Sequence, residues 1–150
     1  MLNIQVQPIS ASLIRDTEVL GEMDPYVICT FMGKVSRSKT HLKGGKEPLW
    51  NDNFLYTAKG LKEFVKVEVW DEDMLKDDLI GTGFLNLMEA VNNQKKGINV
   101  HKVRIEYNNQ VSGVVKFKVL VTNFPTNRLP PDGDKDLRKL EKEIGPILAN

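Results

Sequence analysis

Trp70–Gly81 is an acidic stretch that reads WDEDMLKDDLIG. Its acidic residues occupy five of eight consecutive positions: Asp71, Glu72, Asp73, Asp77 and Asp78. Strand-like patterns stand on both sides, at 64–70 and 83–87, which predicts a loop between two strands. Acids on one loop repel one another, so the loop is either solvated or holds a hard cation. Ca²⁺ suits such a loop because it takes about six to eight oxygen ligands.

The whole chain of 150 residues is long enough for one domain with its own core. Its formal net charge of +1 gives no global field that would attract nucleic acid. The acids are unevenly placed, since nine of 20 lie in two short stretches. The first stretch contains Asp16, Glu18, Glu22 and Asp24, and the second is the one quoted above. Charge is therefore concentrated in two loops.

The chain carries neither a long apolar run nor a secretory pattern, and its start, MLNIQVQ, alternates like a strand. Residue 2 is Leu and no Cys lies near the C-terminus, so the common lipid anchors are not expected. The one cysteine, Cys29, lies in an apolar run and is predicted to be a small buried residue. These features together predict a cytoplasmic protein.

Apolar alternation predicts about eight short strands, punctuated by Gly, Pro and Asn. The clearest patterns cover 2–6, 26–32, 54–56, 64–70, 83–87, 100–107 and 113–121. Pro8 is expected to limit the first strand, and 88–95 is predicted to form a helical turn. Many short strands with such punctuation indicate an antiparallel sandwich.

A basic segment covers 34–46. Four of its residues share one parity and would share one face of a strand: Arg37, Lys39, His41 and Lys43. The common outcome for such a face is simple solvation. The functional alternative is an anion-binding patch.

The chain changes character after residue 123. Residues 124–133 contain three prolines and predict a linker, and the periodicity of 134–144 predicts a helix with an apolar stripe, Leu137, Leu140 and Ile144. The stripe is expected to pack on the sandwich or to dock on a partner or a membrane. The predicted organisation is a domain at 1–123, a Pro-rich linker at 124–133 and a helical tail at 134–150.

Three motifs, MDPYV at 23–27, PLWNDNF at 48–54 and WDED with DDLIG at 70–81, together resemble the C2 domain family over about residues 2–123. The opening strand leads directly into the first acidic stretch, which resembles the type II arrangement of phospholipase C δ. IRDTEVLGEMDPYV at 14–27 is also similar to short single-domain C2 proteins of plants. The predicted fold is therefore all-β: an eight-stranded antiparallel C2 β-sandwich with a short C-terminal helix.

The resemblance implies a Ca²⁺ site built by two loops. Matching the motifs residue by residue gives five carboxylates and two backbone carbonyls: Glu18, Asp24, Asp71, Asp73 and Asp78, with the backbone of Met23 and Glu72. Glu18 departs from the family's Asp, so it either chelates from another angle or costs the site a second ion. Asp16 and Asp77 are nearby substitutes. The second acidic loop is also one residue shorter than in protein kinase C or synaptotagmin.

In this family, bound Ca²⁺ makes the acidic end attractive to anionic phospholipid membranes. Four apolar residues at the loop tips are expected to insert among acyl chains: Val19, Leu20, Met74 and Leu75. The basic segment resembles the family's phosphoinositide site, with Arg37, Lys39, His41 and Lys43 as the residues that contact lipid. The expected function is Ca²⁺-dependent, reversible phospholipid binding by a cytoplasmic protein.

The same residues bear on other classes of protein. An enzyme is not expected, because His41 and His101 have no nucleophile or acid at a characteristic spacing. Nucleic acid is not an expected partner. The alternative is a Ca²⁺-independent interaction scaffold that binds a protein through the basic segment or the C-terminal helix. Glu18 and the shortened loop favour this alternative.

Overall fold

The computed structural model describes residues 1–61 and 63–123. The predicted linker and C-terminal helix lie outside the described residues. The predicted helical turn is present as α1, Leu87–Gln94, where the Asn86 side chain accepts a hydrogen bond of 3.1 Å from the Glu89 backbone N–H. No helix among residues 1–61 and 63–123 is long and apolar enough to cross a membrane.

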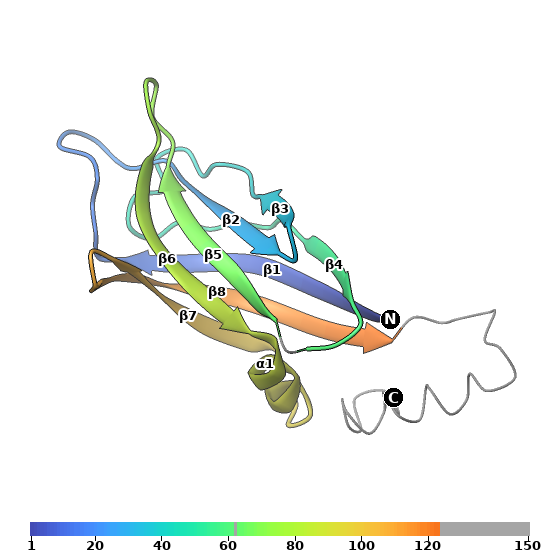
Figure 1. Cartoon of the computed structure of the whole chain (residues 1–150). Helices are drawn as coiled ribbons and strands as arrows, with labels where there is room; N and C mark the ends of the chain where they lie inside the picture. Colours follow the sequence, from blue (N-terminus) through green and yellow to red (C-terminus); the bar gives the residue numbers. More distant parts are fainter. Residues whose placement is uncertain (62, 124–150) are drawn as a thin grey trace, which may run out of the picture.

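Eight strands make up the rest of the domain (Figure 1): β1 Leu2–Leu13, β2 Pro25–Phe31, β3 Lys34–Arg37, β4 Phe54–Ala58, β5 Phe64–Asp71, β6 Asp78–Asn86, β7 Val100–Tyr107 and β8 Gln110–Asn123. All pairs are antiparallel, in the order β3-β2-β5-β6-β7-β8-β1-β4. The order folds into two layers, β3-β2-β5-β6 and β7-β8-β1-β4. They join through a single β6–β7 pair, Thr82 with Glu106. The predicted all-β sandwich is confirmed.

The core lies between the two layers and follows the period-2 pattern of the sequence. Val65, Val67 and Val69 on β5 are fully buried, and so are Val115 and Phe117 on β8. Cys29 is also fully buried, and burial raises the pKa of its thiol. The thiol is therefore a packing group, as the sequence predicts.

Turn chemistry fixes two of the hairpins. Met32 and Gly33 join β2 to β3 with φ of 48° and 83°, and Asn108 and Asn109 join β7 to β8 with φ of 50° and 62°. Two consecutive left-handed residues form the tight turn whose twist matches an antiparallel pair. The turn predicted at Asn108 is thus confirmed.

Three strand predictions are wrong in extent. β1 continues through Pro8 to Leu13, because its register on β8 shifts between Pro8 and Ser10, and such a bulge tolerates proline. β6 begins at Asp78, so Asp78 stands on a strand rather than in the loop. The basic segment is a strand only over Lys34–Arg37.

Two glycines let β6 approach β7. A Cβ at Gly83 would clash with the Arg104 carbonyl oxygen of β7, and one at Gly81 would clash with the Ser112 hydroxyl of β8 and crowd the Ile105 side chain of β7. At Gly83 only glycine fits so close to a neighbouring backbone. These glycines therefore allow the two layers to meet at β6 and β7.

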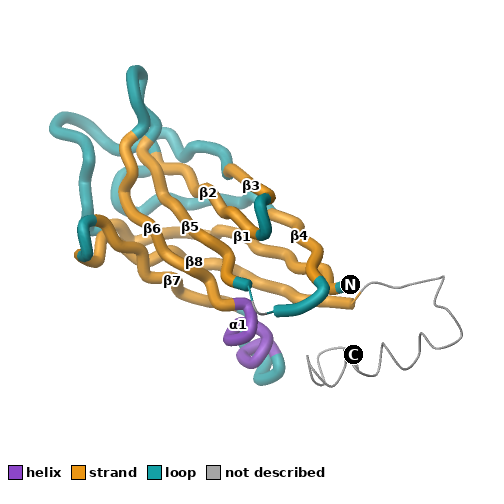
Figure 2. Tube along the Cα trace, viewed as in Figure 1, coloured by secondary structure: helices purple, strands orange, loops and turns teal. Residues whose placement is uncertain are grey.

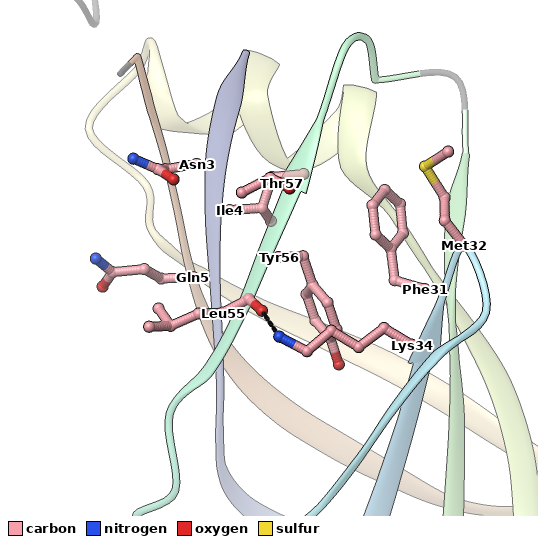
Figure 3. Close-up of a pocket in the computed structure, with 9 residues that line it drawn as sticks. All are labelled: Asn3, Ile4, Gln5, Phe31, Met32, Lys34, Leu55, Tyr56 and Thr57. Carbon is pink, nitrogen blue, oxygen red and sulfur yellow. Dashed lines mark hydrogen bonds between the residues drawn. The ribbon is translucent and has the colours of Figure 1, made fainter. Parts of the chain in front are cut away.

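The opposite edge of the sandwich, between the terminal strands β3 and β4, is open (Figure 3). Lys34 of β3 reaches across it and donates a hydrogen bond of 2.7 Å to the Leu55 carbonyl of β4. Its ammonium also lies 5.6 Å from the centre of the Tyr56 ring. A hollow of about 550 Å³ remains there, lined by Asn3, Ile4, Gln5, Phe31, Met32, Lys34, Leu55, Tyr56 and Thr57. Lys34 thus ties the two layers together.

Candidate metal centre

The two acidic stretches meet at one end of the sandwich (Figure 2). Residues 14–24 form loop 1, which carries the chain from β1 in one layer to β2 in the other. Residues 72–77 form loop 3, which joins β5 to β6 within one layer. Asp71 ends β5 and Asp78 begins β6, and these two residues are paired across the hairpin. The antiparallel hairpin therefore places both acids at the base of loop 3.

Asp71 is fully buried and connects the two loops. Its Oδ1 accepts a hydrogen bond of 2.7 Å from the Asp24 backbone N–H. Its Oδ2 accepts one of 2.8 Å from the Thr17 hydroxyl. A buried carboxylate needs such donors, because leaving it unpaired would be costly. Asp71 therefore fixes both ends of loop 1 against β5.

Asp24 is held in turn by backbone from two other segments. Its Oδ1 accepts a hydrogen bond of 2.6 Å from the Lys43 N–H, and its carbonyl accepts one of 2.9 Å from the Glu72 N–H. Lys43 has a left-handed φ of 59°, as the segment turns toward the acidic end. Loop 1, loop 3 and the 38–53 segment are thus linked through one aspartate.

The pKa of Glu18 reflects the crowding of negative charge between the loops. A hydrogen bond with Asp71, followed by repulsion from Asp71, Asp73 and Asp78, raises the pKa of Glu18 to about 7. The acids surround an open hollow of about 440 Å³ whose lining is Glu18, Glu22, Asp24, Glu72, Asp73 and Met74. All five acids predicted from the motifs are therefore brought to one end of the molecule.

The acidic side chains do not converge on one metal-binding position. Within the part of the chain that the structure describes, no three Asp, Glu, His or Cys side chains converge as metal ligands. The donor set itself fits a hard cation, since it consists of carboxylate oxygens crowded enough to raise a neighbouring pKa. An ion bound here would have to draw the carboxylates inward.

The two substitute ligands are engaged in holding the loops. Asp16 accepts a hydrogen bond of 3.0 Å from the Glu18 N–H. Asp77 accepts one from the Tyr26 hydroxyl and another, of 3.0 Å, from the Asp73 N–H. The Tyr26 hydroxyl and then the Asp73 N–H lower the pKa of Asp77. The predicted backbone ligand of Met23 also has a partner, because its carbonyl accepts 3.0 Å from the Gly45 N–H.

Arg37 is bound to loop 3 rather than displayed with a row of cations. Its guanidinium lies 3.8 Å from the centre of the Tyr26 ring and 3.2 Å from the Glu72 carboxylate. The predicted strand face is wrong, because Lys39, His41 and Lys43 lie in the irregular 38–53 segment. His41 has a structural contact there, since its Nδ1 accepts 2.9 Å from the Leu49 N–H. Lys39 is exposed.

The loop tips project almost bare side chains. The exposed fractions are 97% for Val19, 88% for Leu20, 98% for Met74 and 100% for Leu75. These four side chains therefore do not pack between the loops. Four nearly fully exposed apolar side chains stand beside the acids at the same end.

Several contributors could not be found from the sequence. Thr17 contacts Asp71 although no motif marks it, and Tyr26 contacts Asp77 across 51 positions of sequence. Arg15 stacks 3.7 Å from the centre of the Tyr107 ring and donates 3.3 Å to the Leu79 carbonyl. These contacts link segments that are distant in sequence, so only the fold reveals them.

Comparisons with known proteins identify the family and the fold. The sequence model of the C2 domain family matches residues 2–103, and the chain belongs to this family. Among curated relatives, synaptotagmin-5 of Arabidopsis thaliana is 32% identical over 90 residues, 59% of this chain and 16% of the relative. The 16 kDa phloem protein 1 of Arabidopsis thaliana, a short protein, is 30% identical over 94 residues, 59% of this chain and 60% of that protein.

Solved structures show the same fold. A C2 domain of plant extended synaptotagmin 1 superposes with a TM-score of 0.68 at 15% identity, covering 83% of this chain and 96% of that one. A C2 domain-containing protein from a putative elicitor-responsive gene gives 0.64 at 23% identity, covering 86% and 92%. The calcium-bound tandem C2 domains of extended synaptotagmin 2 give 0.60 at 22% identity, covering 78% and 44%.

Proposed function

We propose that the acids at the loop end hold Ca²⁺ and that the bound ions attach this end reversibly to an anionic phospholipid membrane. The observation that carries the proposal is one of placement. Carboxylates from two loops and four apolar side chains, each at least 88% exposed, occupy the same end of the sandwich. Acidic loops alone would fit a solvated end, and apolar tips alone would fit a protein contact. Ca²⁺-dependent membrane binding would use both.

The proposed ligands are Glu18, Asp24, Asp71, Asp73 and Asp78. Asp16 and Asp77 are assigned instead to holding the loops, because they stand outside the motif positions of the five ligands and accept hydrogen bonds within the loops. Ca²⁺ would supply positive charge among the crowded carboxylates, and lipid phosphates or carboxylates would complete its coordination. The residues of this chain orient the ions and present the apolar tips.

The ligand test leaves Asp71 intact, because Asp71 also supports loop 1. The variant combines Asp73→Asn with Asp78→Asn, and binding is measured by co-sedimentation with phosphatidylserine–phosphatidylcholine vesicles in Ca²⁺, in Mg²⁺ and in EDTA. We expect the Ca²⁺-dependent fraction of binding to disappear. The control, Glu47→Gln with Glu63→Gln, removes two acids outside the loops and should bind normally. Full Ca²⁺-dependent binding by the loop variant would refute the proposal.

The apolar tips need a separate test. Leu75→Ser should weaken Ca²⁺-dependent vesicle binding by roughly tenfold or more, since burying one leucine side chain contributes about 1.5–3 kcal/mol. Leu55→Ser is the matched control, because Leu55 is 55% exposed but lies on β4, away from the loop end. Equal loss in the two variants would show that the tips do not insert.

A Ca²⁺-independent scaffold that binds a protein remains the second candidate. It is favoured by one observation: among the described residues the acids do not converge as ligands, and both oxygens of Asp71 accept internal hydrogen bonds. The two candidates differ in a single measurable property, the Ca²⁺ dependence of binding. Under the first, the protein moves between the cytoplasm and a membrane as Ca²⁺ rises; under the second, Ca²⁺ changes nothing.

A further inference from the structure

Four cations stand on the outward face of β7 and β8, far in sequence from the predicted basic segment. Lys102 and Arg104 lie on β7, and Lys116 and Lys118 lie on β8. We call these four residues the β7–β8 patch. Their strand neighbours point inward, since Val103, Ile105, Val115, Phe117 and Val119 are buried in the core. Alternation therefore places all four cations on the opposite, solvent-facing side.

The strand register brings like charges together. Lys102 is paired directly with Lys116, and Lys118 stands two residues further along β8, opposite Val100. Like charges directly opposite one another on a sheet are destabilising. The sheet therefore carries a repulsion that an anion on this face would relieve.

Few acidic side chains on the same face balance the positive charge of the patch. Over residues 1–61 and 63–123 the ion pairs are Arg37 with Glu72 and Lys66 with Glu68, and neither involves the patch. The neighbouring strand β1 contributes neutral side chains to this face, including Gln5 and Gln7, which pair with Leu120 and Lys118. One acid, Glu106, shares the face, and it stands at the end of β7 opposite Val111.

We propose that the β7–β8 patch is a second membrane-binding surface, which attaches to an anionic lipid leaflet without Ca²⁺. Basic side chains near such a surface are attracted by its negative potential within a Debye length. The patch is formed by regular strands, so it is present whether or not the acidic loops hold an ion. This inference stands apart from the Ca²⁺ proposal, because it concerns different residues and the opposite ionic condition.

The chemistry of the face favours lipid over nucleic acid. Proteins that bind single strands stack bases on aromatic side chains. The outward positions of β7 and β8 beside the patch are filled instead by Val100, Val114 and Leu120. Reading a duplex requires an element that enters a groove, whereas these residues lie on the face of a sheet. Cations on a broad face with aliphatic neighbours suit a surface of phosphate headgroups.

The test uses the full chain in EDTA, so that no Ca²⁺ is available to the loop end. Lys102→Ala with Lys116→Ala is compared with the unchanged protein by co-sedimentation with phosphatidylserine–phosphatidylcholine vesicles at low ionic strength. Each cation near an anionic surface strengthens attachment roughly fivefold, so the double variant should bind roughly twenty-fivefold more weakly. Raising the salt concentration should weaken the unchanged protein more steeply than the variant.

Two controls keep the test specific. Lys59→Ala with Lys66→Ala removes the same charge outside the patch and should leave binding within about twofold. Lys102→Arg with Lys116→Arg keeps the charge and should retain binding. Thermal melts establish that every variant is folded. Unchanged vesicle binding by the folded Ala variant would overturn the proposal, and an acidic protein or a nucleic acid would then be the occupant to test.

The two membrane surfaces fail in different ways. Loss of the patch should remove binding in EDTA and leave the increment that Ca²⁺ adds. Loss of Asp73 and Asp78 should remove the increment and leave binding in EDTA. If the patch variant instead lost only the Ca²⁺ increment, the patch would be part of the loop site and the inference would be wrong.

Discussion

The acidic loop end and the β7–β8 patch are both crowded with like charges, but the fold treats them differently. At the loop end, Asp71, Asp24 and Asp77 each accept hydrogen bonds from backbone or hydroxyl donors. Glu72 has an arginine partner. In the patch, among the described residues, neither Lys102 nor Lys116 has an acidic partner.

The difference follows from what each kind of partner requires. A metal ion needs oxygens at defined positions, so its ligands must be anchored. A charged surface is diffuse and asks only for net charge, which long lysine side chains supply without anchoring. We infer that charged side chains held by hydrogen bonds mark a metal-ion site. Charged side chains without such partners mark a surface that contacts many lipid headgroups. Four experiments test this distinction.

The largest expected effect is on folding stability, from Asp71→Ala. This change removes two hydrogen bonds and leaves the Asp24 N–H without its buried acceptor, so it should cost roughly 3 kcal/mol in denaturant unfolding. Asp73→Ala, on an exposed residue of the same cluster, should change stability by less than about 0.5 kcal/mol. Similar losses in both variants would show that anchoring is not what distinguishes Asp71.

Adding Ca²⁺ should stabilise the folded protein, because the ion would bind only where the loops are assembled. At about a hundred times its dissociation constant, a ligand adds roughly 2.7 kcal/mol, which should raise the melting midpoint by several degrees. Mg²⁺ at the same concentration is the control, and the Asp73→Asn, Asp78→Asn protein should lose the shift. A shift that persists in that variant would place the ion elsewhere.

Replacing Arg37 tests whether this cation belongs to the anchored region. Arg37→Ala removes the stacking on Tyr26 and the ion pair with Glu72, both partly exposed, and should cost about 1 kcal/mol. Arg37→Lys should recover little of the lost stability, since an ammonium lacks the planar group that stacks on Tyr26. Lys39→Ala, an exposed cation two residues away, should be neutral. If Arg37→Ala left the folding stability unchanged, Arg37 would be a solvated surface cation like Lys39.

The smallest effect is expected in the patch. Lys116→Glu replaces a repulsive cross-strand pair with an attractive one, so it should stabilise the fold by about 0.5 kcal/mol while weakening binding to anionic vesicles in EDTA. Opposite signs for stability and binding are the signature of a charge kept for a partner. Arg104→Glu, opposite Val114, lacks a cation directly across and should give the weaker stabilisation. Destabilisation by Lys116→Glu would mean that an unseen acid already pairs with it.

Most of the fold could be predicted from local patterns. Val65, Val67 and Val69 alternate as they should for a half-buried strand, and Asn108 and Asn109 mark a turn that the structure confirms. What failed depends on pairing between distant segments. Pro8 stays within β1 because β1 itself bulges between Pro8 and Ser10, and β6 starts early because it follows β5 up to Asp71.

The candidate site divides in the same manner. Spacing around MDPYV and WDED identified the five acids that meet at one end. It could not identify Thr17 or Tyr26, whose partners lie 54 and 51 residues away. The shared strand face predicted for Arg37, Lys39, His41 and Lys43 is wrong, because parity implies a shared face only on a strand and β3 ends at Arg37. The β7–β8 patch needed the register, which places Lys102 beside Lys116.

The connection made by loop 1 has a kinetic consequence. Loop 3 is a hairpin loop, so its acids are brought together as soon as β5 and β6 pair. Loop 1 passes between the layers, and β1 is held by β8, where Leu2 pairs with Asn123. Closing so long a span of chain is slow compared with forming a hairpin. The complete set of acids therefore assembles late in folding, and the appearance of cation affinity during refolding would time the docking of the two layers.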